Sequence, residues 1–224
     1  MKYFPITCTD NFFKNPDYIR DFGLSQEFSP SLHGKFPGER TRELRHLDEG
    51  LRVKIIRKIL STFFTSEQRH GATVTISFQK ILPYDFLSRE SVLNSGWIHR
   101  DHGHDLAGLI YLNPFSYSDS GTTFYKEKVD HIENDPVHRF NWYKTHENES
   151  DYLEKLKHNH SQYEEVLNVG NVYNRLIMYE GANVPHKENS FWVNDYEPRL
   201  SLIFFIKHMQ FDTSPIGRCQ EFDL

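Results

Sequence analysis

The alternation of apolar and polar residues from Ala72 onward is the feature that most constrains the fold. In residues 72–82, Val74, Ile76 and Phe78 alternate with polar neighbours, which is the period-two pattern of a half-buried strand. Further strands are predicted at 106–112, 122–125, 175–179 and 199–207. Strands follow strands, and helices are predicted mainly at the N-terminus, so the chain is predicted to be α+β, or all-β with helical cover.

The first 70 residues predict the helical cover. Asn15, Pro16 and Asp17 supply an N-cap, a proline at the first helical position and an acid in the first turn. A second amphipathic helix fits residues 48–64. Between the two helices, residues 33–42 predict a loop because they contain glycine and proline.

No linker divides the chain, so residues 1–224 are predicted to form one domain. It comprises a helical part at 1–70, a strand-rich core at 71–208 and a tail at 209–224. The polar segment 126–170 interrupts the core with a predicted helix around 152–167. A long insert of this kind is either a lid over a site or a surface decoration, and the sequence leaves both open.

Charge and cysteine content exclude several functional classes. The net charge is −5, which lacks the basic footprint of a nucleic-acid-binding protein. No apolar run reaches membrane-spanning length, and the N-terminus lacks the order of a signal peptide. The two cysteines, Cys8 and Cys219, form no CxxC pair. We therefore expect a cytoplasmic protein without a disulfide, a membrane partner or a nucleic-acid partner.

The densest cluster of potential ligands lies at residues 97–105, which contain three histidines and two aspartates. On an extended chain His99 and Asp101 point to the same side. His186, which follows a predicted strand, is the candidate third ligand. Two histidines and one carboxylate leave half an octahedron open, which suits non-haem Fe(II) with a chelating cosubstrate and O₂. His102 and His104 are the substitutes if Asp101 is not a ligand.

Arg199 opens a strand that is otherwise largely apolar, and Ser201 shares its face. A buried guanidinium needs an anionic partner, and its fork of donors matches a carboxylate. The phenol of Tyr111, on another apolar strand, is placed to reach the same anion. Two alternatives stay open: Tyr111 as a core tyrosine bonded to a carbonyl, and Ser201 as a small packing residue.

Other polar residues have two interpretations each. Gln79 and Asn113 either line the mouth of a pocket or satisfy strand ends. Residues 36–40 form either a substrate-gripping loop or, as we expect, a structural turn.

Rival enzyme classes lack their motifs. A zinc hydrolase of the metallo-β-lactamase type needs an Asp-His pair after its first two histidines, and here His104 is followed by Asp105 and Leu106. The sequence contains neither a Gly-x-Ser-x-Gly nucleophile elbow nor a phosphate-binding glycine loop.

The order of these motifs resembles a known family. His99-Arg-Asp101, then His186, then Arg199-Leu-Ser201 in an apolar strand is similar to the Fe(II)/2-oxoglutarate-dependent dioxygenases, and most similar to the prolyl-hydroxylase branch. Residues 109–113 and 121–124 resemble the strands after the first metal ligands in that branch. The N-terminal part resembles small uncharacterised bacterial and phage-borne members. One departure is Arg199, where procollagen-type prolyl 4-hydroxylases have lysine.

The resemblance implies a double-stranded β-helix, or jelly-roll, with the N-terminal helices packed on the major sheet. It implies Fe(II) held by His99, Asp101 and His186, with 2-oxoglutarate and O₂ as cosubstrates and ascorbate as a reductant. The distal carboxylate of 2-oxoglutarate would lie against Arg199, Ser201 and Tyr111. The implied reaction hydroxylates a peptidyl proline or a small molecule and releases succinate and CO₂. The alternative is a non-catalytic, cupin-like metal-binding or interaction module.

Overall fold

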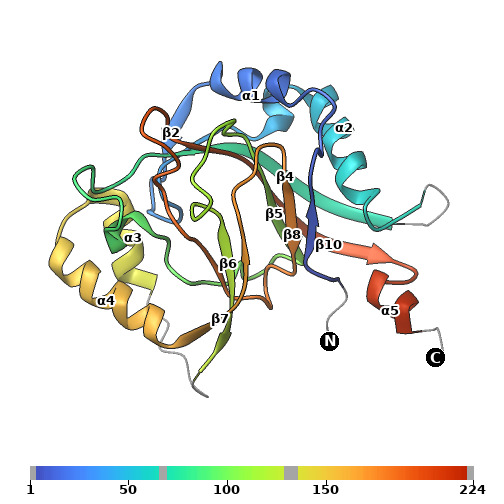
Figure 1. The fold of residues 1–224 in the computed structure, drawn as a ribbon. Helices are drawn as coiled ribbons and strands as arrows, with labels where there is room; N and C mark the ends of the chain where they lie inside the picture. The colour runs from blue at the N-terminus through green and yellow to red at the C-terminus, as the bar shows by residue number, and fades with distance from the viewer. Residues whose placement is uncertain (1–3, 66–69, 129–135, 221–224) are drawn as a thin grey trace.

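The computed structural model describes residues 4–65, 70–128 and 136–220, and its strands form two sheets (Figure 1). Every pairing between these strands is antiparallel. The larger sheet has seven strands, in the spatial order β1 (Thr7–Thr9), β8 (Leu176–Tyr179), β5 (Leu106–Tyr111), β10 (Arg199–Phe211), β4 (His70–Ile81), β3 (Glu39–Thr41) and β2 (Phe28–Pro30). The smaller sheet has three, in the order β7 (Tyr163–Val169), β6 (Thr122–Glu127) and β9 (His186–Glu188).

The register of the larger sheet sets one row of polar residues side by side. Ser201 on β10 is paired with Gln79 on β4 and with Tyr111 on β5, and Gln79 is paired in turn with Arg40 on β3. Residues directly opposite each other on paired strands project from the same face. The polar row Arg40, Gln79, Ser201 and Tyr111 therefore crosses four strands on the inner face of the sheet.

The N-terminal helices cover the outer face of the larger sheet. α1 (Pro16–Leu24) begins at an Asn15 cap whose side chain accepts from the Tyr18 N–H, and α2 (Glu49–Leu60) begins at the Asp48 cap. Their apolar stripes pack on the outward side chains of β4, β5 and β10. Gly23 of α1 lies directly against the Phe78 ring, where a larger residue would not fit. Figure 1 shows both helices along this face.

The smaller sheet faces the inner side of the larger one. Phe124 and Val169 of the smaller sheet pack with Leu109, Ile177 and Ile203 of the larger sheet in one buried cluster. Two facing antiparallel sheets with helices outside form a jelly-roll, and the predicted fold class is confirmed.

The predicted insert differs from the structure in its second half. It contains α3 (Pro136–Thr145) and α4 (Glu149–Ser161), but residues 163–169 form β7 and not the end of a helix. The predicted helix around 152–167 is therefore wrong after Ser161. β7 pairs with β6 along its length, so tertiary pairing decides its structure. Residues 129–135 of the predicted insert lie outside the described residues.

Other boundaries also shift. The loop predicted at 33–42 contains β3, and the part predicted as helical also contains β1 and β2. The predicted tail contains the end of β10, to Phe211, and α5 (Pro215–Gln220). Two short 3₁₀ turns span Leu44–His46 and Val92–Asn94. No helix in the described part of the chain combines the length and apolar character that crossing a membrane requires.

Candidate active site

Three predicted metal ligands come together at one end of the cavity between the sheets. His99 and His186 face each other across an antiparallel bridge, in which each backbone N–H donates to the other residue's carbonyl at 3.0 Å. Asp101 lies two residues beyond His99, and its N–H donates to the Gly181 carbonyl at 2.8 Å. The alternation along this extended segment turns His99 and Asp101 to the same side, as their spacing predicts.

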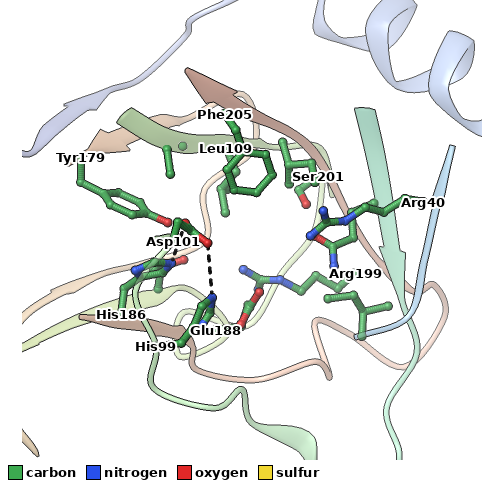
Figure 2. Close-up of a pocket in the computed structure, with 16 residues that line it drawn as sticks. Arg40, His99, Asp101, Leu109, Tyr179, His186, Glu188, Arg199, Ser201 and Phe205 are labelled. Atoms are coloured by element: carbon green, nitrogen blue, oxygen red, sulfur yellow. Dashed lines mark hydrogen bonds and ion pairs between the residues drawn. The ribbon is translucent and has the colours of Figure 1, made fainter. Parts of the chain in front are cut away.

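Backbone carbonyls orient both imidazoles. The Nδ1 atom of His99 lies 2.7 Å from the Trp97 carbonyl, and Nδ1 of His186 lies 3.0 Å from the Val184 carbonyl. A carbonyl oxygen can only accept, so each Nδ1 carries the proton and each Nε2 presents a lone pair. Both Nε2 atoms point to the Asp101 carboxylate, at 3.7 Å from His99 and 3.4 Å from His186 (Figure 2).

Burial and the charges of neighbouring groups shift the pKa values of all three residues. Burial lowers the pKa of His99 to about 4, and the neighbouring His186 acts in the same direction. Burial also disfavours charged His186, but the Asp101 carboxylate outweighs it and raises the pKa of His186. For Asp101, burial raises the pKa while the two histidines lower it more, so the pKa lies well below its usual value. His99 and Asp101 are therefore in their ligating protonation states at neutral pH.

The donor set fits a divalent transition metal. One ligand atom from each of His99, Asp101 and His186 lies within 4.8 Å of the others. Two imidazole nitrogens and one carboxylate on one side of a cavity form the two-histidine, one-carboxylate set typical of non-haem Fe(II). The carbonyls behind both Nδ1 atoms supply the outer hydrogen bonds that metal-bound histidines require.

Arg199 lies in the cavity on the side away from the triad (Figure 2) and is 1% exposed. Its Nη1 donates to the carbonyls of Ser120 and, at 3.3 Å, Ser190, and its Nη2 donates to Gly121 at 3.4 Å. These neutral acceptors hold the guanidinium in place without neutralising it. Among the described residues no carboxylate lies within ion-pair distance of Arg199.

Ser201 and Tyr111 lie beside Arg199 in different settings. Ser201 lines the cavity, two residues along the same strand. The Tyr111 hydroxyl donates to Thr122 Oγ1 at 2.8 Å, and the Arg199 Cζ lies 5.3 Å from the centre of its ring. Burial raises the pKa of Tyr111, so the phenol stays protonated. Thr122, which lines the cavity, therefore connects Tyr111 to it.

The other polar residues considered from the sequence differ in whether they line the cavity. Gln79 lines the cavity, whereas the Asn113 amide bonds the Pro198 carbonyl and the Leu200 N–H and so satisfies a strand end. His102 is exposed. His104 packs its ring 4.7 Å from the Phe205 ring, and neither histidine belongs to the triad found among the described residues.

Two charged cavity residues were not predicted as site residues. Glu188 lies two positions after His186 on β9, so the alternation that places His186 inward also turns Glu188 inward. Burial raises the pKa of Glu188, but His99 and Arg199 lower it further, so the carboxylate is ionised. Arg40, expected in a structural turn, lines the cavity from β3. Its position depends on a strand pairing that no local pattern indicates.

Comparison with known sequences places the chain in a family. Residues 2–187 match the sequence model of DUF6445, a family of unknown function, and the chain belongs to this family. No curated protein matches the sequence.

Comparison with solved structures identifies the fold. A prolyl hydroxylase from Trichoplax adhaerens, in complex with a hypoxia inducible factor peptide fragment, aligns with a TM-score of 0.51 and 13% identity, over 97% of this chain and 87% of that one. HygX from Streptomyces hygroscopicus, with nickel and 2-oxoglutarate bound, aligns with a TM-score of 0.51 and 11% identity. The alignment covers 90% of this chain and 82% of HygX. SnoK, a non-haem alpha-ketoglutarate-dependent carbocyclase from nogalamycin biosynthesis, aligns with a TM-score of 0.50 and 9% identity. The alignment covers 97% of this chain and 86% of SnoK. The chain therefore has the fold of the Fe(II)/2-oxoglutarate oxygenases, as its motifs predict.

Proposed function

We propose that this chain is an Fe(II)- and 2-oxoglutarate-dependent oxygenase. The observation that carries the proposal is the convergence of His99, Asp101 and His186 within 4.8 Å, at one end of a cavity whose other side holds the buried guanidinium of Arg199. The first set fits the metal and the second fits a carboxylate. A cosubstrate with a metal-chelating end and a distal carboxylate needs both.

Each residue has a distinct task in this proposal. His99 and His186 offer Nε2 lone pairs, and Asp101 offers a carboxylate whose charge offsets that of the metal. Bound Fe(II) would supply the oxygen-activating chemistry by which 2-oxoglutarate and O₂ hydroxylate a substrate and yield succinate and CO₂. Leu109, Ile203 and Phe205 line the cavity with apolar groups, which limits the access of water to the reacting atoms.

Arg199 would bind the distal carboxylate of 2-oxoglutarate. Its backbone acceptors fix the orientation of the fork, so little side-chain entropy is lost on binding. Ser201 would donate one further hydrogen bond from the same strand. The Tyr111 hydroxyl would do so by turning its proton from Thr122 to the carboxylate. Ascorbate would serve as an external reductant.

The substrate would be a peptidyl proline or a small molecule. The fold is shared by the peptide-binding hydroxylase and by SnoK and HygX, so fold similarity favours neither class. A non-catalytic metal-binding module on the same fold is the competing function, and it predicts metal binding without binding of 2-oxoglutarate.

Anaerobic titration tests the proposal. Fe(II) is added to the metal-free protein, and 2-oxoglutarate is then added while visible absorption is recorded. Chelation of the metal by 2-oxoglutarate should produce a weak metal-to-ligand charge-transfer band that is absent from the His99→Ala protein. Fe(II) binding without this band, and without 2-oxoglutarate-dependent succinate formation, would favour the binding module.

A further inference from the structure

Arg40 brings a second guanidinium into the cavity, from a strand far from Arg199 in sequence. Figure 2 shows the Arg40 and Arg199 side chains entering from the side opposite the triad. The Arg40 Cζ lies 3.9 Å from the centre of the Phe36 ring and 5.6 Å from that of Phe205. The Phe205 ring also contacts His104, close to the metal ligands in the chain. Arg40 therefore borders the space between the cosubstrate side and the triad.

Local structure holds Arg40 in this position. Gly38 has a φ of +67°, and a Cβ added to it would lie too close to the Lys80 carbonyl oxygen, so a side chain would not fit. This turn sets β3 against β4 and pairs Arg40 with Gln79. The Gln79 amide donates to the Pro37 carbonyl at 2.9 Å, which turns its oxygen to Arg40.

The guanidinium has very few polar partners. Within the described part of the chain it makes a single hydrogen bond, a long one from Nη2 to Gln79 Oε1 at 3.5 Å, and its buried Nε has no partner there. No carboxylate among the described residues lies within ion-pair distance of it. Burial lowers the pKa of Arg40 to about 10, against the opposing effect of Asp101 and Glu188, so the side chain stays charged. The Arg40 residue is half-buried, so this little hydrogen bonding compensates the desolvation of its guanidinium only in part, and a bound anion would compensate the rest.

We propose that Arg40 is a specificity-determining residue that binds a carboxylate of the primary substrate, so the substrate is a carboxylate-bearing small molecule. The proposal rests on the proposed oxygenase function and names its substrate class. Arg40 lies two strands from β10, at about 4.8 Å per strand, so Arg199 and Arg40 offer separate sites for two anions. Asp101 and Glu188 also face the cavity, which favours a singly charged carboxylate over a phosphate.

The experiment uses fluorinated probes on the anaerobic protein loaded with Fe(II) and 2-oxoglutarate. The probes are 4-fluorobutanoate and 4-fluorophenylacetate, each beside its primary amide, and binding is read from the broadening of ¹⁹F NMR signals by the paramagnetic metal. We expect each acid to bind at least tenfold more tightly than its amide. Arg40→Gln should abolish this preference, and Arg40→Lys should keep part of it because an ammonium retains the charge without the fork.

The matched control is Arg42→Gln, which removes the same charge from an exposed side chain next to β3 and should keep the full acid preference. Affinity for 2-oxoglutarate, measured by the charge-transfer band, should stay within threefold of the parent in Arg40→Gln. Equal binding of acids and amides by the parent would overturn the proposal. An acid preference that survives in Arg40→Gln, or a large loss of 2-oxoglutarate affinity in that variant, would overturn it as well. Failure of the parent to bind 2-oxoglutarate would instead refute the oxygenase function itself.

Discussion

At the scale of single residues, the candidate site combines groups that are fixed by the backbone with groups that await a partner. The two histidines have their Nδ1 protons on carbonyls and direct their Nε2 atoms to the Asp101 carboxylate, the point at which a metal would bind. Arg199 is oriented by carbonyls and interacts with the Glu188 carboxylate only beyond ion-pair distance. The structure thus fixes the positions of its donors before any ligand binds, which reduces the ordering cost of binding.

Removal of any one ligand should abolish metal-dependent turnover. His99→Ala, Asp101→Ala or His186→Ala should each lose Fe(II) binding and 2-oxoglutarate-dependent succinate formation while the protein stays folded. Equilibrium dialysis measures the metal and circular dichroism the fold. The control is His102→Ala, an exposed histidine beside the triad, which should match the parent. Full succinate formation by His99→Ala would show that the ligands are misassigned.

Fe(II) affinity should fall as the pH falls. In the metal-free protein Asp101 raises the pKa of His186, so the metal must displace a proton from His186 below that pKa. His99, with a pKa of about 4, stays neutral over this range. Affinity should therefore drop about tenfold per pH unit between the pKa of His186 and pH ~4. Calorimetry in buffers of different ionisation enthalpy counts the released proton, and a pH-independent affinity would contradict the assignment.

The same shifts act on the stability of the metal-free protein with opposite signs. The raised pKa of His186 contributes stability at low pH that is lost as the pH rises through that pKa. The lowered pKa of His99 contributes stability above the ordinary histidine pKa that is lost as the pH falls toward 4. The two contributions oppose each other, so the pH dependence of metal binding is the sharper measurement.

Arg199→Ala should weaken 2-oxoglutarate binding by about 3–5 kcal/mol, the loss expected when a buried charge pair loses one member. Arg199→Lys should recover only part of this, since an ammonium cannot make the planar two-bond contact. Ser201→Ala and Tyr111→Phe should each cost less, roughly 1.5–3 kcal/mol. The charge-transfer band measures all four affinities, and Fe(II) binding should survive in each variant. Parental affinity in Arg199→Ala would make Arg199 a structural residue.

At the scale of elements, α4 holds the segment that carries the first two proposed metal ligands. The Asn159 amide accepts from the Ile98 N–H at 2.9 Å and donates to the Ile98 carbonyl at 3.1 Å, and His160 Nε2 lies 2.9 Å from the Gly96 carbonyl. Trp142 and Tyr152 of the two helices stack at 4.8 Å, and Tyr152 also contacts the Trp97 ring. α3 and α4 thus pack directly against the segment that carries His99 and Asp101.

Asn159→Ala should therefore weaken Fe(II) binding as well as the fold. The substitution leaves the buried N–H and carbonyl of Ile98 without partners, which costs about 1–3 kcal/mol each in free energy of unfolding. It also loosens the backbone next to His99. Denaturant unfolding and metal titration measure the two effects, and Asn168→Ala, an exposed asparagine on β7, is the control. If metal affinity matches the parent, α4 stabilises the fold without positioning the ligands.

The helices and strands also show which parts of the structure can be predicted from the sequence alone. Asn15 caps its helix as predicted, and the His-x-Asp spacing brings both side chains to one point because alternation is a local property. β7 and β3 were not predicted for the opposite reason. Residues 163–169 follow a helix and become a strand because β6 offers a partner, and the three residues of β3 are fixed by pairing with β4. The position of Arg40 in the cavity therefore depends on strand pairing, although its loop at 36–40 had substrate contact as one of two interpretations.

At the scale of the whole molecule, the proposed metal ligands come from distant parts of the chain. His99 and Asp101 precede α3 and α4 in the chain, and His186 follows these helices. The backbone bridge between His99 and His186 joins the segment before the helices to the segment after them. The helices of the insert contact the segment before them through Trp97 and Ile98. We propose that the helical part, the core and the insert form one folding unit.

One folding unit predicts a single thermal unfolding transition, detected at the same temperature by far-UV circular dichroism and by tryptophan fluorescence. Bound metal should raise that temperature, since an ion present at 100 times its dissociation constant adds about 2.7 kcal/mol to the free energy of unfolding. Zn(II) serves as a redox-inert probe. Two separate transitions, with only one shifted by metal, would show that the insert unfolds independently.

Because His99 and His186 lie in different halves of the chain, the proposed metal centre would need ligands from both halves. A cut between α3 and α4, near His146, would leave His99 and Asp101 on one fragment and His186 on the other. Neither fragment alone would contain a complete set of ligands, and each would lack strands that pair with the other in both sheets. Fragments produced separately should therefore regain metal binding only when mixed, and the metal would act as a reporter of their reassembly.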